Sequence, residues 1–351
     1  MPNDVGTSPE RRMVPALTLV LLSPVVAEVL SGATRLSTIF ALIPEIMLWG
    51  CGALMIRETA RRRALGWNSV LLMGLALSIA EEFLIQQTSI APLPWLASGP
   101  IYSRAWGVNW LYFLFMLGYE SVWVGLVPIQ LVELIFPERR TEPWLRLPGL
   151  IATAVIFILG AFVAWYGWVK RVRPMVFHAP PYQPPPITIL IGALAIVILL
   201  AASLHLRPRR PQVLPRPPAP GLLGVITLAL GLPWYGIIML AFTSDPKFRA
   251  LPFWIPMTGG IAWAAMVFLI IRRWSSASDW GDAHRYALIF GATMVPIVGG
   301  FAGSGSWPRT DLMGKTVFDL IAIFLLIALG RVLQNRSSTD SLQKPVNYLQ
   351  R

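Results

Sequence analysis

Six glutamates lie inside or at the rim of long apolar segments near the start of the chain, and no histidine, lysine or arginine is placed deep enough to neutralise them. A carboxylate in hydrocarbon costs roughly 2.5–3.5 kcal/mol on insertion scales. Helices that carry such groups turn them toward a protein interior, water, a metal or a transported ion. The sequence therefore predicts a polar site inside a bundle of membrane helices, drawn from Glu28, Glu45, Glu81, Glu82, Glu120 and Glu133.

The composition supports a membrane protein because the chain is far more apolar than a soluble domain. Of its 351 residues, 55% are hydrophobic and 13% are charged, whereas soluble domains carry about 25% charged residues. A membrane helix needs about 20 apolar residues, and the chain supplies that length repeatedly. We predict an all-α, polytopic membrane protein with about ten transmembrane helices, at roughly 13–34, 37–57, 67–90, 109–135, 149–169, 187–206, 221–243, 252–271, 285–303 and 315–334.

The basic residues predict how these helices are oriented. The net charge of +12 is concentrated at helix ends and in short loops, which is typical of membrane topology and argues against a nucleic-acid partner. With the N-terminus inside, 20 of the 29 lysines and arginines fall in cytoplasmic segments. We therefore expect both termini in the cytoplasm. The excess of arginine over lysine indicates a bacterial source, and hence the bacterial inner membrane. The basic cluster at 170–173 is an exception, because this topology places it outside.

Proline-rich sequence divides the chain. Residues 207–220 are rich in proline and arginine and should form an extended cytoplasmic linker. The linker separates a glutamate-rich bundle of about six helices, 1–206, from a second bundle of about four helices, 221–336. The polar residues 337–351 are predicted to form a mobile tail. The single cysteine, Cys51, excludes an intrachain disulfide and a cysteine metal cluster, and no motif identifies a cofactor or an oligomeric state.

Depth along the helices groups most of these glutamates. At about 1.5 Å of rise per residue, Glu28, Glu45, Glu82 and Glu120 each lie roughly 9–16 Å below the outer surface. Four consecutive helices thus place a carboxylate in one layer, whereas Glu133 falls near the inner end of its helix. We expect this layer to be a polar cavity that opens toward the outer half of the membrane.

Helical spacing refines the third predicted helix. Ser78, Glu82 and Gln86 share one polar stripe, and Glu81 points about 100° away from it. The adjacent acidic pair and Glu120 are the candidates for chemistry or metal binding. The candidates for the wall of the cavity are Glu28, Glu45, Ser78 and Gln86.

Three functions fit this pattern. Crowded carboxylates cannot all stay ionised unless a cation is bound, so the first function is transport or binding of a cation, protons, or a polar or lipid headgroup. The second is a membrane-embedded hydrolase in which Glu81 or Glu82 is the general base and Glu120 assists. The third is a structural or assembly protein whose glutamates brace helix packing. A transporter needs a polar path that continues from the acids toward the cytoplasm, and the only candidates for that continuation are the acid Glu133 and the amide Gln130.

Two resemblances follow from motifs in the first half. The block of Pro44-Glu45-Ile46, Ile56-Arg57-Glu58, Arg61-Arg62, Gly66-Trp67 and Glu81-Glu82 resembles a group of bacterial multi-pass membrane proteins of unassigned function. The pair Glu81-Glu82 also resembles the first motif of the CPBP (Abi-type, CAAX-processing) intramembrane proteases. That resemblance implies glutamates that activate water for peptide cleavage, with histidines on later helices. Here Gln86 or Gln87 stands where that family has arginine, and His178, His205 and His284 lie outside the apolar segments or at their ends.

Several other features have simpler explanations. Glu58 has helical spacing to Arg61 and Arg62, which predicts a solvated ion pair at the cytoplasmic face. Asp319 follows Lys315 by four residues, which predicts a pair near the outer surface. Gly299 and Gly303 predict close helix packing, with a broken segment lining a cavity as the alternative. The outer loop 91–108 is either a lid over the glutamates or an ordinary amphipathic loop.

Overall fold

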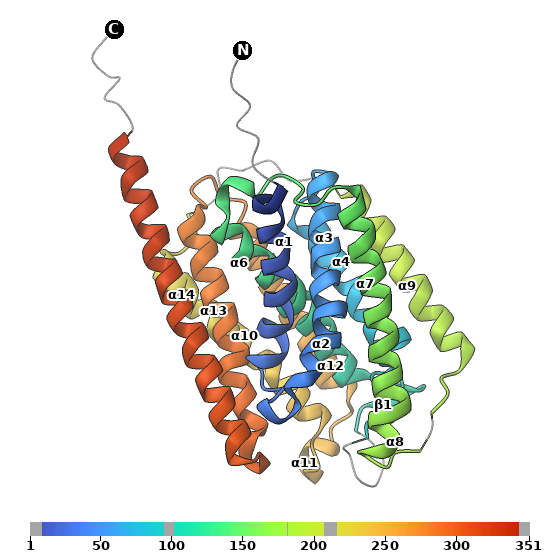
Figure 1. The fold of residues 1–351 in the computed structure, drawn as a ribbon. Coiled ribbons are helices and arrows are strands. Elements are labelled where there is room, and N and C mark those ends of the chain that lie inside the picture. Colours follow the sequence, from blue (N-terminus) through green and yellow to red (C-terminus); the bar gives the residue numbers. More distant parts are fainter. Residues whose placement is uncertain (1–8, 95–101, 181, 207–215, 344–351) are drawn as a thin grey trace, which may run out of the picture.

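Long apolar helices make up almost all of the described chain (Figure 1). The computed structural model describes residues 9–94, 102–180, 182–206 and 216–343. Within this part, nine helical segments are long and apolar enough to cross a membrane, and Met13–Val29 is a shorter apolar helix. These ten segments correspond one to one to the ten predicted helices, so the prediction of an all-α, multi-pass membrane architecture is confirmed. The nine longer segments are Leu36–Arg62, Trp67–Ile85, Trp110–Ile135, Leu147–Met175, Pro186–His205, Pro220–Ala241, Trp254–Trp274, Asp282–Ser306 and Arg309–Arg336.

Figure 1 labels the elements within these segments, and short η segments continue many of the helices. The first part of the chain contains α1 (Pro9–Pro24), η1 (Val25–Val29), η2 (Leu36–Ala41), α2 (Leu42–Glu45), η3 (Ile46–Gly50), α3 (Cys51–Arg62), α4 (Trp67–Ile79), η4 (Ala80–Ile85), β1 (Arg104–Ala105), β2 (Val108–Asn109), α5 (Trp110–Tyr119), η5 (Glu120–Leu126), α6 (Val127–Ile135) and η6 (Pro137–Arg139). The remainder contains α7 (Leu147–Trp165), η7 (Tyr166–Val172), α8 (Arg173–Met175), α9 (Pro186–His205), α10 (Pro220–Ala241), α11 (Pro246–Arg249), α12 (Trp254–Trp274), α13 (Asp282–Gly299), η8 (Gly300–Ser306) and α14 (Arg309–Gln343).

The helices alternate in direction, so α1 begins and α14 ends on the same side of the bundle, at the top of Figure 1. We call this side the terminal side. An even number of crossings agrees with the predicted topology, in which both ends of the chain lie on one side. The predicted linker falls largely at 207–215, outside the described residues.

The two predicted bundles pack against each other. The Trp123 indole N–H in η5 donates to the Ala292 carbonyl of α13 at 2.8 Å. The Trp234 indole N–H in α10 donates to the Phe115 carbonyl of α5 at 3.1 Å. Gly118 allows this approach, because a Cβ there would lie 2.3 Å from the Trp234 ring. Aromatic residues of both bundles therefore share one core.

Helix α14 differs from the predicted end of the chain. It continues without a break to Gln343, so residues 337–343 of the predicted mobile tail are helical. The rest of that tail lies outside the described residues. The predicted pairing of Lys315 with Asp319 is confirmed, with Nζ 2.7 Å from the carboxylate. Lys315 also donates to the carbonyls of Leu30 and Ile297, which fastens α14 to the ends of η1 and α13.

The glycine-rich end of α13 packs closely at its first glycines only. A Cβ on Gly299 would lie 2.7 Å from the Tyr235 ring, and one on Gly300 would lie 2.1 Å from the Ser31 carbonyl oxygen. A Cβ on Gly303 would meet nothing within 4 Å. The predicted packing through both Gly299 and Gly303 is therefore correct for Gly299 and wrong for Gly303.

Candidate functional site

Three glutamates from two neighbouring helices meet in the interior of the bundle. Glu81 and Glu82 lie in η4, and Glu120 is the first residue of η5. One carboxylate oxygen from each of the three lies within 4.8 Å of the other two. Their side chains are buried, with exposed fractions of 2%, 1% and 2%. We call these three residues the glutamate cluster.

The helix changes type where the adjacent pair reaches the cluster. Regular α-helical spacing predicts that Glu81 points about 100° away from Glu82, and both side chains nevertheless bring an oxygen within 4.8 Å of Glu120. Residues Ala80–Ile85 form a π-helical turn, with the Gln86 N–H donating to the Glu81 carbonyl at 2.9 Å. The π turn inserts one extra residue into the helix at the position of this pair, and such turns are often found at functional sites.

Each glutamate of the predicted layer lies in or directly beside a π-helical segment, and a fifth such segment, η7, carries none. Glu28 lies within η1, and Glu45 is the last residue before η3. Both of these segments are π-helical, as are η4 and η5. Such bulges are rare and are often found at functional sites. The conjunction of buried or half-buried acids with π turns on four helices marks this layer as the candidate site.

The cluster offers more acceptors than donors. The Ser89 hydroxyl donates to a Glu82 oxygen at 2.6 Å. The Ser78 hydroxyl donates to the Met116 carbonyl at 3.2 Å and lies close to Glu120. Both oxygens of Glu120 and one oxygen of Glu81 are buried without a hydrogen-bond partner. This arrangement therefore requires a group that accepts electron pairs, such as a proton or a metal ion.

Glu28 and Glu45 extend the layer beyond the cluster. Glu28 interacts electrostatically with both Glu45 and Glu81. One oxygen of Glu45 accepts a 2.5 Å hydrogen bond from the Thr34 hydroxyl, and its other oxygen is buried without a partner. These residues form a row of acids that leads from the loop after η1 to the cluster.

Two tyrosines that were not predicted lie beside the acids. Tyr112 is within electrostatic reach of all three cluster residues. The Tyr119 hydroxyl donates to the Ala27 carbonyl, next to Glu28, and its ring stacks on Trp123. Tyr119 directly precedes Glu120, which was the available signal. Nothing in the sequence distinguishes Tyr112 from other tyrosines at helix ends.

The chain that follows η4 is braced on the side opposite the termini. The Asn109 side-chain amide donates to the carbonyls of Thr88 and Ala91 at 3.0 and 2.7 Å. Arg104 donates to the Asn109 side-chain oxygen and to the Ile90 carbonyl. These contacts fix the turn that carries Ser89. The predicted lid spans 91–108, and its residues 95–101 lie outside the described part of the chain.

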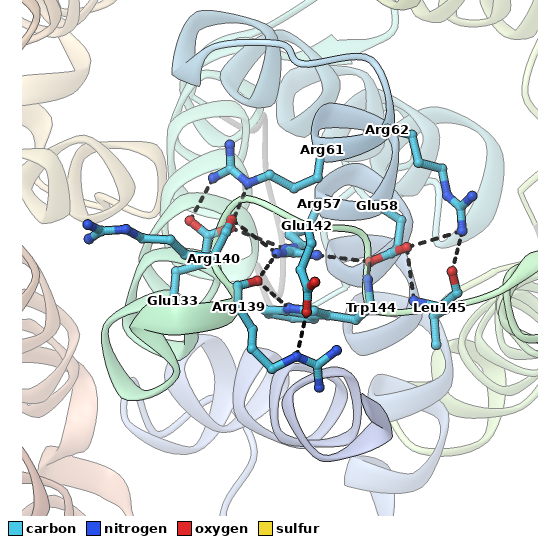
Figure 2. A network of polar contacts seen from close by, with 10 residues as sticks. All are labelled: Arg57, Glu58, Arg61, Arg62, Glu133, Arg139, Arg140, Glu142, Trp144 and Leu145. Atoms are coloured by element: carbon cyan, nitrogen blue, oxygen red, sulfur yellow. Dashed lines mark hydrogen bonds and ion pairs between the residues drawn. The ribbon is translucent and has the colours of Figure 1, made fainter. Parts of the chain in front are cut away.

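On the terminal side, an ion-pair network holds Glu133 (Figure 2). Glu133 accepts from Arg57 at 3.2 Å and from Arg61 at 2.6 and 2.8 Å. The expectation that no basic residue reaches the six glutamates is therefore wrong for Glu133. The cause is that α3 brings two arginines, one turn apart, against α6. As a result Glu133 does not continue the row of free acids toward the terminal side.

The same network buries Glu58, which was predicted to be solvated. Its carboxylate accepts from Arg57 at 3.0 Å and from the backbone N–H groups of Trp144 and Leu145 at 2.8 and 3.2 Å. Arg57 is completely buried, stacks 3.4 Å from the centre of the Trp144 ring, and donates to the carbonyls of Arg139 and Arg140. The loop after α6 folds over Glu58 and excludes water.

The histidines do not complete a protease-like site. In the described part of the chain, the one group of at least three potential metal ligands is the glutamate cluster. The His284 ring stacks on Trp280, and His205 contacts the Ala201 carbonyl on its own helix. No family model, curated protein or solved structure matches this chain. Both family resemblances therefore stay predictions.

Proposed function

We propose that this chain is a membrane protein whose glutamate cluster binds a divalent cation in the interior of the helix bundle. The observation that carries the proposal is the convergence of three buried carboxylates with unpartnered oxygens. Buried charges in proteins are paired or coordinate metals. None of the ion pairs formed by described residues involves Glu81, Glu82 or Glu120. A bound cation would supply the missing counter-charge.

The ligand atoms indicate the class of cation. The cluster offers carboxylate oxygens and a nearby serine hydroxyl, with no sulfur or imidazole. Oxygen ligands of this kind suit Mg²⁺, Ca²⁺ and Mn²⁺, whereas thiolate and imidazole favour Zn²⁺ and copper. Three carboxylates exceed the charge of one divalent ion, so one of them can keep a proton.

The surroundings favour exchange with the side opposite the termini. There, Glu28 and Glu45 connect the cluster to the loop after η1. Toward the terminal side, Glu133 is fully engaged by Arg57 and Arg61. We infer that the terminal side is cytoplasmic, in a bacterial inner membrane, from the distribution of basic residues. Transport across the membrane would require the network of Arg57 and Glu133 to open.

A second candidate, a membrane-embedded hydrolase, is favoured by the close approach of Glu82 and Glu120. A cation held by two carboxylates could activate a water molecule, with the third carboxylate as general base. This role uses the same residues and the same cation. It differs in requiring that a lipid or peptide substrate reach the cluster.

Equilibrium dialysis of the detergent-purified protein against Mn²⁺ tests the proposal. Wild type should bind about one ion per chain, and Glu81→Gln, Glu82→Gln and Glu120→Gln should each bind at least tenfold more weakly. Glu138→Gln is the matched control, because Glu138 is exposed. Circular dichroism and gel filtration establish that each variant is folded. Equal binding by all folded variants, or no binding by wild type, would overturn the proposal.

A further inference from the structure

A cleft separate from the glutamate layer lies between α10, α13 and α14. It has a volume of about 910 Å³, and its inner walls are apolar, with Leu228, Phe290, Met294 and Ile327 among them. Its mouth, on the terminal side, is polar and includes Asp279 and Arg331. Membrane-facing clefts of this size are filled by lipid or by another helix, and the chemistry of the mouth distinguishes the two.

The depth of the cleft matches one leaflet of a bilayer. Its lining on α13 runs from Asp282 to Met294, which is about 18 Å at 1.5 Å per residue. The hydrocarbon core of a bilayer is about 30 Å thick. The cleft therefore begins at the terminal-side rim and ends near the middle of the membrane, as a site for one lipid of that leaflet should.

Helix α13 forms the floor of the cleft, because it contacts both α10 and α14. A Cβ on Gly291 would lie 2.3 Å from the Gly224 carbonyl oxygen, so α10 and α13 touch along the floor. Helix α14 is joined to α13 by the hydrogen bond from the Tyr286 hydroxyl to the Leu326 carbonyl, at 2.8 Å. Above the floor, α10 and α14 form opposite walls. The apolar side chain of Val225 on α10 is 65% exposed and lines this space.

The mouth carries charges of both signs. Asp282 is already neutralised, because it lies 2.6 Å from Arg140 and 3.5 Å from Arg285. This leaves Arg331 and Asp279 as the exposed charged residues of the lining. The helices α10 and α13 both begin here, at Pro220 and Asp282, so their N-terminal dipoles add positive potential. A phosphate and an ammonium group would both find a partner.

We propose that this cleft binds a zwitterionic phospholipid whose headgroup carries a phosphate and a primary ammonium, as in phosphatidylethanolamine. Arg331 and the helix N-termini receive the phosphate, and Asp279 receives the ammonium. One acyl chain lies between Leu228 and Ile327. We favour a lipid over a helix of a partner protein, because a headgroup with a phosphate and an ammonium can pair with both Arg331 and Asp279. The inference does not rest on the proposed cation site.

Native mass spectrometry of the delipidated full-length protein tests this site. Equal amounts of phosphatidylethanolamine, phosphatidylglycerol and phosphatidylcholine are added, and wild type should retain phosphatidylethanolamine at least fivefold over each of the others. Val225→Trp should fill the cleft and abolish this retention. Val197→Trp is the matched control, because Val197 is 61% exposed on α9 and does not line the cleft.

Two charge variants test the headgroup assignment. Asp279→Asn should remove the preference for phosphatidylethanolamine over phosphatidylglycerol, and Arg331→Gln should weaken binding of all three lipids. Arg273→Gln, an exposed arginine on α12 outside the cleft, should leave binding unchanged. Equal lipid retention by Val225→Trp and Val197→Trp, or a wild type without headgroup preference, would overturn the proposal.

Discussion

Arg57 on α3 and Glu133 on α6 form a buried ion pair, with Nε 3.2 Å from the carboxylate, where the bundle closes toward the terminal side. Arg57 is 0% exposed, and it also pairs with Glu58 at 3.0 Å. Arg57 therefore bridges two buried acids and the loop carbonyls of Arg139 and Arg140, while the partly exposed Arg61 and Arg62 pair with the same acids from outside. The stability of the first bundle should depend on this one guanidinium.

Replacing Arg57 by alanine should lower the free energy of unfolding by about 3–5 kcal/mol, because it removes the completely buried partner of both Glu58 and Glu133 and the donor to two loop carbonyls. Denaturant unfolding in detergent, followed by circular dichroism, measures the loss. Arg63→Ala, at an exposed position just after the end of the same helix, should change stability by less than about 0.5 kcal/mol. Similar values for the two variants would show that the network adds no net stability.

Removing the Lys315 ammonium should also be costly. Lys315→Met leaves Asp319 and the Leu30 and Ile297 carbonyls without their donor, for an expected loss of about 3 kcal/mol. The double variant Lys315→Met/Asp319→Leu should recover part of this loss, since it also removes the orphaned carboxylate. A double-mutant cycle on the unfolding free energies gives the coupling. A coupling near zero would contradict the pairing.

Close contact between α1 and η3 makes Gly50 sensitive to a single methyl group. A Cβ at Gly50 would lie 2.1 Å from the Val20 carbonyl oxygen, and backbone cannot move aside easily. Gly50→Ala should therefore destabilise the protein by about 1–3 kcal/mol. Gly236→Ala in α10 meets nothing within 4 Å and should be neutral or stabilising by up to about 1 kcal/mol. Melting temperatures of the two variants would show this difference, and the opposite order would contradict it.

Cation binding by the cluster should weaken as the pH falls. Carboxylates must be deprotonated to act as ligands, so protons compete with the metal. The apparent dissociation constant for Mn²⁺ should rise by up to about tenfold per pH unit for each proton displaced. Dialysis over a series of buffers between neutral and mildly acidic pH measures this dependence. Binding that does not change with pH would exclude carboxylate ligands.

Much of the architecture could be predicted from the sequence, because the bilayer imposes a fixed length on each helix. The positions of all ten apolar segments follow from hydropathy alone, and the pairing of Lys315 with Asp319 follows from their spacing of four residues. The convergence of Glu82 and Glu120 agrees with the predicted depth of each residue. These features depend on the local sequence pattern and on the thickness of the bilayer.

The remaining features depend on tertiary contacts. Glu81 and Glu82 lie in a π-helical turn, η4, and no residue pattern in Ala80–Ile85 specifies that turn. Glu58 is buried because a loop from beyond α6 folds over it, so its spacing to Arg61 and Arg62 could not reveal its environment. The proximity of Tyr112 to the acids likewise follows from how α5 packs on α4.

The most direct test of the central claim is an experimental structure of the protein soaked with Mn²⁺, with diffraction recorded at the manganese absorption edge. The proposal predicts an anomalous peak between the carboxylates of Glu81, Glu82 and Glu120, and its loss in folded Glu120→Gln. A well-ordered glutamate cluster with no peak, or a peak that persists in Glu120→Gln, would contradict the proposed cation site.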